Sequence, residues 1–164
     1  MTIKFLDWLS EPNWSDFTHL GYACAIRRTS SLNLCGYVCL PSSHPWADPD
    51  RCEREAKVHG GITWHGSEPP EYPPALENTP GVIWIGFDCS HYGDLSPADA
   101  FPPREEVYRT WAYVKGEVED LAEQAGRIER SENALSVEEV LAKVSAKLGA
   151  IPAQILRDEL ARRG

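Results

Sequence analysis

The sequence contains no apolar run that approaches the roughly 20 residues a helix needs to cross a bilayer. Its first stretch, MTIKFLDWLSEPNW, lacks the basic start and long apolar centre of a secretory signal peptide. Basic residues are in deficit, because 16 Lys and Arg stand against 25 Asp and Glu, for a formal net charge of −9. Nucleic-acid binders need clustered Lys and Arg for phosphate contacts. We therefore expect no direct nucleic-acid binding, no membrane association and a cytoplasmic location.

The five cysteines lack any CxxC pair. An odd number of cysteines in a cytoplasmic chain argues against a disulfide framework. Cys24, Cys35 and Cys39 stand among Tyr, Val, Leu and Ile, so we expect small buried hydrophobic side chains there. The spacing of Cys35 and Cys39 has no second pair that would complete a four-ligand zinc site.

Four runs rich in aromatic and β-branched residues predict strands, at 19–29, 32–42, 56–66 and 81–91. Ser30 and Ser31 separate the first two runs closely enough for a hairpin. Between the last two lies SEPPEYPPALENTPG, whose prolines predict an extended surface loop.

A long helix is predicted after the strands by apolar residues that recur three and four positions apart. These residues are Val107, Trp111, Val114, Val118, Leu121 and Ala125. Glu105 and Glu106 suit its first turn, and Gly126 is the expected stop. The capping box Ser136-x-x-Glu139 predicts a second helix that ends at Gly149, and Pro152 suits the first turn of a third.

Together these signals predict an α+β fold. It would contain an antiparallel sheet of about four strands, one long helix packed on the sheet, and a C-terminal helical hairpin. We expect a core domain over residues 1–126 and a helical appendage over 127–164 that serves packing or self-association.

Residues suited to chemistry concentrate in KVHGGITWHG at 57–66 and GVIWIGFDCSHYGD at 81–94. If these two runs pair antiparallel, His59 faces the end of the next strand, near Asp88, and His91 follows in the turn. The glycines after His59 leave room for a close approach to the backbone. We predict that His59, Asp88 and His91 lie within about one side-chain length of each other, with a His–Asp hydrogen bond of about 2.7–3.2 Å. The candidate ligand-binding residues are His44, His59, Gly60, Gly61, Asp88, His91 and Asp94, and the catalytic candidates are His59, Asp88, Cys89 and His91.

Several uses of this group remain open. His and Asp bind divalent metals, an aspartate can orient a histidine as a general base, and Cys89 beside a histidine can act as a nucleophile. The structural alternatives are an aspartate that caps its own turn and a histidine bonded to a main-chain carbonyl. The sequence identifies no metal and no cofactor.

Four segments, GYVCLPSSHPW, VHGGITW, IGFDCSHYGD and YRTWAYVKGEVEDLAEQ, occur in an order that resembles a family of small phage and prophage proteins. The resemblance covers roughly residues 20–125 and leaves 127–164 outside the pattern. It implies a viral or prophage origin, hence a location in the host cytoplasm, but no reaction. It also groups the candidate residues into one constellation, namely His44, His59, Asp88, Cys89, His91 and Asp94.

Two functions follow from these expectations. The favoured one is a stoichiometric inhibitor of a host defence system, similar to an anti-CRISPR protein, whose acidic surface and C-terminal helices dock on a basic nucleic-acid-binding effector. The C-terminal helices would also suit a homo-oligomer. The alternative is a protein that binds, or hydrolyses, a small ligand such as a nucleotide in a His/Asp/Cys pocket, with Arg27, Arg28 and the Gly60–Gly61 amides as phosphate donors.

Overall fold

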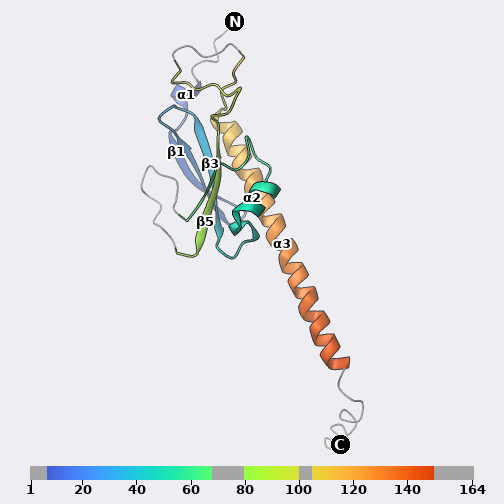
Figure 1. Ribbon diagram of the computed structural model, residues 1–164. Coiled ribbons are helices and arrows are strands. Elements are labelled where there is room, and N and C mark those ends of the chain that lie inside the picture. Colours follow the sequence, from blue (N-terminus) through green and yellow to red (C-terminus); the bar gives the residue numbers. More distant parts are fainter. Residues whose placement is uncertain (1–6, 68–79, 100–104, 150–164) are drawn as a thin grey trace, which may run out of the picture. The chain divides into compact units, whose positions relative to one another are not determined.

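The computed structural model describes residues 7–67, 80–99 and 105–149 (Figure 1). The contacts of the chain divide it into two units, Met1–Arg127 and Ile128–Gly164, which are described separately. None of the described helices is long and apolar enough to cross a membrane. The elements in chain order are α1 (Asp7–Ser10), β1 (Trp14–His19), β2 (Tyr22–Arg28), β3 (Leu34–Pro41), the short 3-10 helix η1 (Pro45–Ala47), α2 (Pro49–Glu55), β4 (Trp64–Gly66), β5 (Val82–Asp88) and α3 (Trp111–Gly149).

The described strands form one antiparallel sheet of five strands in the order β1-β2-β3-β5-β4. The expected α+β fold is therefore confirmed, with one strand more than the four expected. The additional strand is β1, at one edge, which pairs with β2 through a turn at Leu20 and Gly21. Both turn residues have positive φ, 49° and 89°, as a two-residue hairpin requires. The residues of β1 are alternately exposed and half-buried. An edge strand of this kind needs few apolar residues, and its sequence, WSDFTH, therefore lacks the hydrophobic pattern that would predict a strand.

The strand predicted at 56–66 is wrong over most of its length, because only Trp64–Gly66 pairs with β5. Gly60 and Gly61 adopt φ of 67° and 88°, which is outside the range of regular strand residues. The Gly61 amide donates to the Val58 carbonyl at 3.0 Å. Residues 56–63 therefore contain a turn at His59 and Gly60 instead of extending the sheet.

The core lies between the sheet and the first half of α3. Val114, Val118 and Leu121 are fully buried, as the apolar spacing predicts. The helix approaches β3 closely at Gly36, where a Cβ atom would overlap the side chains of Val118 and Phe87. Because Gly36 has no side chain, α3 can pack directly against the middle of β3.

The helix begins at Trp111, later than the sequence indicated. The Thr110 hydroxyl accepts from the Tyr113 amide at 3.3 Å, and Glu11 Oε1 accepts from the Trp111 amide at 2.8 Å, so two oxygens cap the first turn. Val107 lies outside the helix, is 53% exposed, and forms a parallel bridge with Asp94. The prediction that Val107 and the two glutamates before it start the helix is wrong.

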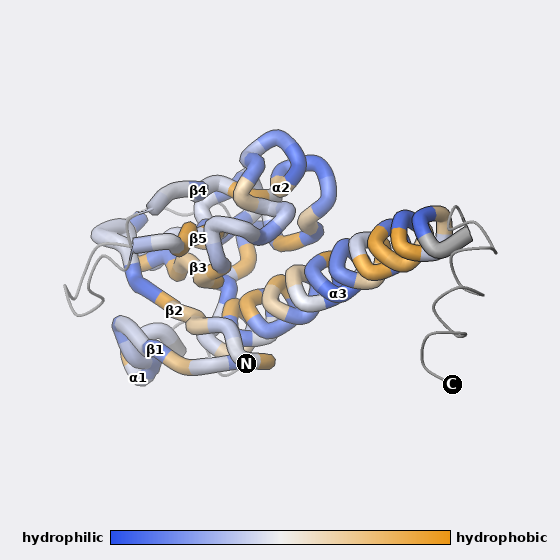
Figure 2. Tube along the Cα trace, turned by 90° about the horizontal axis from the view of Figure 1, so that it is seen from below, coloured by the Kyte–Doolittle hydropathy of each residue, from blue (hydrophilic) through white to orange (hydrophobic). Residues whose placement is uncertain are grey.

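The predicted breaks inside the helix are also wrong, because α3 continues through Gly126 and Ser136 to Gly149. A glycine ends a helix when it adopts the left-handed conformation itself. A glycine that stays helical among good helix formers lowers helix stability by only about 1 kcal/mol relative to alanine. Glu123 and Arg127 pair across Gly126 at 3.7 Å. The third helix predicted at Pro152 lies outside the described residues. Figure 2 shows hydrophobic and hydrophilic residues alternating along α3.

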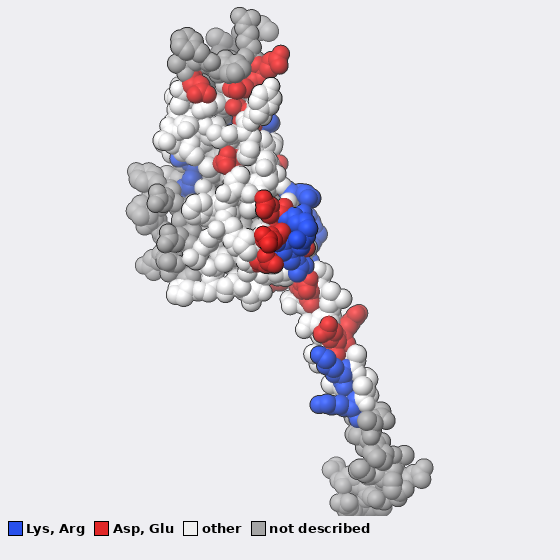
Figure 3. All heavy atoms as spheres, in the orientation of Figure 1, with Lys and Arg blue, Asp and Glu red and all other residues white. Residues whose placement is uncertain are grey.

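Charged side chains of both signs gather around α2. Arg51 pairs with Glu55 at 3.0 Å and Arg54 reaches the same carboxylate at 3.7 Å. On the face shown in Figure 3, acidic and basic side chains lie next to each other there, and no continuous acidic patch covers the described part of that face. The net charge of −9 is thus not concentrated into one patch on this side.

Replacing Leu121 with alanine should lower the free energy of unfolding by about 2–5 kcal/mol, because the change removes a fully buried side chain and leaves a cavity. The matched control is Leu141→Ala in the same helix, where the side chain is 59% exposed and the expected change is within about 0.5 kcal/mol. Urea unfolding followed by circular dichroism measures both. Equal losses for the two variants would contradict the packing described.

Truncation after Arg127 should leave a domain that melts cooperatively, with little change in melting temperature. The buried residues of α3 extend only to Gly126, and the large side chains from Leu135 to Val144 are exposed. Scanning calorimetry of the truncated and full-length chains provides the comparison. Loss of the cooperative transition would show that residues 128–164 belong to the core.

Candidate functional site

The Asp94 carboxylate is the centre of a cluster of polar side chains at the end of β5. Its side chain is only 1% exposed. One oxygen, Oδ2, accepts from His59 Nε2 at 2.7 Å and from the His91 backbone amide at 3.0 Å. The other oxygen, Oδ1, accepts from Arg109 Nε at 2.7 Å. Burial alone would raise the pKa of Asp94, but these hydrogen bonds outweigh it and hold the pKa of the carboxyl below its ordinary value.

The His59 ring is fixed at both of its nitrogens. Because an ionised carboxylate can only accept, the hydrogen toward Asp94 belongs to His59 Nε2. In the neutral ring, Nδ1 is then left to accept from the Tyr113 hydroxyl, 3.1 Å away. The His59 backbone amide donates to Glu117 Oε2 at 2.8 Å. The turn that carries His59 is therefore attached to α3 through both its main chain and its ring.

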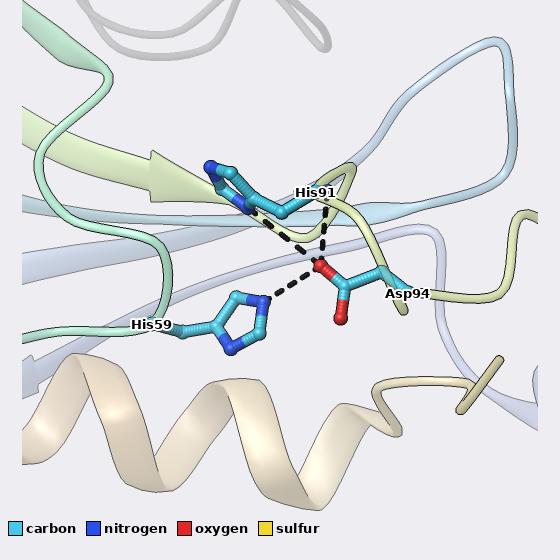
Figure 4. A group of neighbouring side chains, drawn as sticks. All are labelled: His59, His91 and Asp94. Carbon is cyan, nitrogen blue, oxygen red and sulfur yellow. Dashed lines mark hydrogen bonds and ion pairs between the residues drawn. The ribbon is translucent and has the colours of Figure 1, made fainter. Parts of the chain in front are cut away.

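The His91 ring lies beside the His59 ring, with centroids 5.5 Å apart. Its Nδ1 is 3.6 Å from Asp94 Oδ2 and 3.9 Å from Asp88 Oδ1. This nitrogen is buried and has no hydrogen-bond partner among the described residues. Figure 4 shows both rings turned toward the same oxygen of Asp94.

Gly60 shapes the site through the side chain that it lacks. A Cβ atom at this position would overlap the His91 imidazole, and the φ of 67° also disfavours any other residue. The expected close approach to the backbone is thus made by the His91 ring. Gly61 has open space beside it and contributes only its conformation.

The structure brings His59, His91 and Asp94 together, around Asp94 instead of Asp88. Asp88 lies at the margin, where its Oδ1 accepts from the Ser90 amide at 2.9 Å and caps the turn. His44 is not part of the cluster. It is 3% exposed, and its ring bonds the Trp46 amide and the Ala125 carbonyl. Ala125 is about 18 Å along the helix from Tyr113 at 1.5 Å per residue, so His44 is a structural residue.

Cys89 is not placed to act as a nucleophile. It is 1% exposed, and burial together with the nearby Asp94 charge raises the pKa of the thiol. A thiol that stays protonated is a poor nucleophile. The expectation that Cys89 takes part in covalent chemistry therefore has no support in the geometry.

Sequence reasoning missed the residues that α3 and its approach contribute to the cluster. Arg109, Tyr113 and Glu117 follow each other at intervals of four and all reach the turn at His59 or Asp94. Arg109 also lies over the Tyr113 ring, 5.2 Å from its centroid. The available signal was this polar i, i+4, i+8 series beside the apolar stripe.

The arginines proposed as phosphate donors are already engaged. Arg27 is 4% exposed and pairs with Asp16. Arg28 bonds Glu11 and the Tyr108 hydroxyl. The arginine that reaches the cluster is Arg109 instead.

Two imidazoles and one carboxylate offer three donor atoms that all lie within 4.8 Å of one another. Such a group can orient a histidine for proton exchange with a bound ligand, or it can hold a metal ion. Comparison of the chain with known protein families, curated proteins and solved structures gave no match. The phage-family resemblance therefore stays a prediction, and function is inferred from the geometry of the cluster.

In the folded protein, iodoacetamide at about pH 8 should label Cys39 first and leave the other four thiols largely unmodified, because burial suppresses their thiolates. Burial raises the pKa of Cys24 and Cys35 to about 11 and that of Cys52 to about 12, and Cys39 is the half-buried one. Intact mass and peptide mapping give the order of labelling, with urea-unfolded protein as the control in which all five react. Rapid native labelling of Cys89 would contradict its assignment as a buried structural thiol.

Proposed function

We propose that the core unit binds a small polar ligand at the cluster formed by His59, His91, Asp94, Arg109 and Tyr113, here called the Asp94 cluster. The observation that carries the proposal is the chain of hydrogen bonds from Tyr113 through His59 to Asp94 and on to Arg109. It fixes two rings and a guanidinium in one orientation. The side chains of His91 and Arg109 nevertheless remain 32% and 28% exposed.

A purely structural network is the alternative explanation for this cluster. Buried ion pairs contribute little to stability compared with apolar residues of the same size. A structural network also normally satisfies all its members, whereas His91 Nδ1 has no hydrogen-bond partner among the described residues. Charged groups with displaced pKa values beside accessible histidines are typical of functional sites.

The chemistry of the cluster selects the class of ligand. Of the three nitrogens of the Arg109 guanidinium, only Nε has a hydrogen-bond partner among the described residues. The two terminal nitrogens can therefore bind a carbonyl, carboxylate or phosphoryl oxygen. His91 adds a ring nitrogen that can donate or accept. A nucleotide meets both requirements, and hydrolysis is the reaction class that such a group of residues can support.

A thermal-shift panel of ribonucleoside mono-, di- and triphosphates and cyclic nucleotides tests this proposal. At least one compound should stabilise the wild-type protein, and Arg109→Met should weaken its binding about tenfold or more, since a charged hydrogen bond is worth about 1.5–3 kcal/mol. The matched control is Arg51→Met, which removes an arginine from the surface pair on α2 and should bind as the wild type does. Equal binding by the Arg109 and Arg51 variants would place the ligand elsewhere. Turnover of a bound compound would show hydrolysis.

We propose host-protein inhibition as the second candidate function, because a run of large apolar side chains on α3 is exposed. Exposed apolar patches on a protein surface commonly mark interaction sites. In this account the partner is a basic nucleic-acid-binding effector of the host, bound by the helix face with added attraction from the net charge of −9. The residues of this face, at helical spacings of three and four, are Val137, Val140, Leu141 and Val144, each 47–59% exposed.

Affinity capture from a host lysate separates the two candidates. The inhibitor proposal expects one large basic protein to be retained by the wild-type chain and by His59→Phe, and to be lost with the double variant Leu141→Glu, Val144→Glu. Retention by the double variant would exclude this helix face. Sedimentation of the purified protein shows whether the same face joins two copies instead.

A further inference from the structure

We propose that His59, His91 and Asp94 hold a divalent transition-metal ion, through His59 Nε2, His91 Nδ1 and Asp94 Oδ2. This inference rests on the proposed ligand site and deepens it, since the ion would supply the positions at which a polar ligand binds.

The spacing of the three donor atoms is close to what an ion needs. Two ligands at about 2.1 Å from a metal are ~3.0 Å apart at a right angle and ~3.4 Å apart in a tetrahedral arrangement. The distance from Asp94 Oδ2 is 2.7 Å to His59 Nε2 and 3.6 Å to His91 Nδ1. One ligand atom from each of the three residues lies within 4.8 Å of the other two. Side-chain movements on the order of 1 Å would therefore bring them into a coordination shell.

The buried Nδ1 of His91 is a second, independent observation. It faces the Asp94 carboxylate without a hydrogen bond, although buried polar atoms are nearly always paired. A cation between the nitrogen and the oxygen would satisfy both lone pairs. Gly60 allows the ring to occupy this position, because a Cβ atom on residue 60 would overlap the imidazole.

Outer hydrogen bonds of the kind that orient metal ligands are already in place. Arg109 holds the second oxygen of Asp94, and the Tyr113 hydroxyl holds the second nitrogen of His59. An ion at His59 Nε2 would replace the hydrogen there, and Nδ1 would then donate to the Tyr113 oxygen, which can accept as well as donate. Partners of this type fix the ring orientation of metal-bound histidines.

Local charge also favours a cation. Among the described residues, Asp94, Asp88 and Glu117 contribute three carboxylates in or next to the cluster, and Arg109 contributes one guanidinium. Two imidazoles with one carboxylate suit zinc, iron(II), manganese or cobalt better than magnesium or calcium, which prefer oxygen ligands. Three protein ligands leave positions open, as in catalytic sites and unlike closed structural ones.

Isothermal titration calorimetry of the chelator-treated full-length protein, with Zn²⁺ and Mn²⁺ in separate experiments, tests the inference. One ion should bind per chain, and His91→Ala should weaken binding by more than about tenfold to 100-fold, which is the loss typical of removing only an outer hydrogen-bond partner. The matched control is His65→Ala, because His65 bonds the Trp46 carbonyl at 3.0 Å outside the cluster, and it should bind as the wild type does. Binding of Co²⁺ should give ligand-field absorption bands that the His91 variant lacks. Circular dichroism melts of both variants establish that they are folded.

The inference is overturned if neither ion binds, or if His91→Ala and His65→Ala bind equally well. Binding of a nucleotide to the metal-free protein, lost with Arg109→Met, would leave the ligand site in place without an ion. Stoichiometric metal binding without any nucleotide binding would instead support the metal site and remove the nucleotide as its ligand.

Discussion

A carboxylate that is withdrawn from water must be surrounded by donors, since an unpaired buried charge costs several kcal/mol. Asp94 meets this condition with donors from three separate parts of the chain. They are the turn at His59, its own turn at His91, and Arg109 just before α3. Both carboxylate oxygens of Asp94 need hydrogen-bond donors, and this requirement fixes how two loops and the segment just before α3 meet at the end of β5.

The neighbouring features follow from that constraint. The turn at 56–63 must leave the strand direction to bring His59 over the carboxylate, and the left-handed glycines allow it to do so. The segment at Asp94 pairs with Val107, which keeps residues 105–110 out of the helix until Thr110 and Glu11 cap it. The same helix supplies Tyr113 to the site on one face and Val114, Val118 and Leu121 to the core on another.

The parts of the fold that were predictable are those governed by local hydrophobic pattern. Strands β2, β3 and β5 lie in runs of mostly apolar residues that include aromatic and β-branched side chains, and the buried stripe of α3 has helical spacing. The strand at 56–66 was wrong because VHGGITW has strand-like composition, whereas the two glycines adopt turn conformations. Edge strand β1 and helix α2 were missed. The first buries little, and α2 is a single short helix that begins where the Asp48 carboxylate accepts from the Asp50 amide at 3.0 Å.

The expected antiparallel pairing of the two runs was enough to propose His59, His91 and Asp94, but not to rank them. Asp88 and Asp94 are equivalent in sequence terms, and only tertiary packing buries one of them and leaves the other 33% exposed. Tyr113 lies on α3 and Arg109 just before it, and the hydrophobic pattern there indicates only the opposite, buried face of the helix. His44 was included through its place in a motif, whereas its ring caps η1 and bonds α3.

The claim on which the account depends is that Asp94 accepts a hydrogen bond from His59 Nε2. A long-range ¹H–¹⁵N correlation spectrum of the metal-free protein reports the tautomer of each histidine, at about pH 8.5 where imidazoles are normally neutral. The account predicts that His59 carries its hydrogen on Nε2 and that Asp94→Ala abolishes this preference. A His59 ring protonated on Nδ1 in the wild-type protein would contradict the hydrogen-bond chain and, with it, the site.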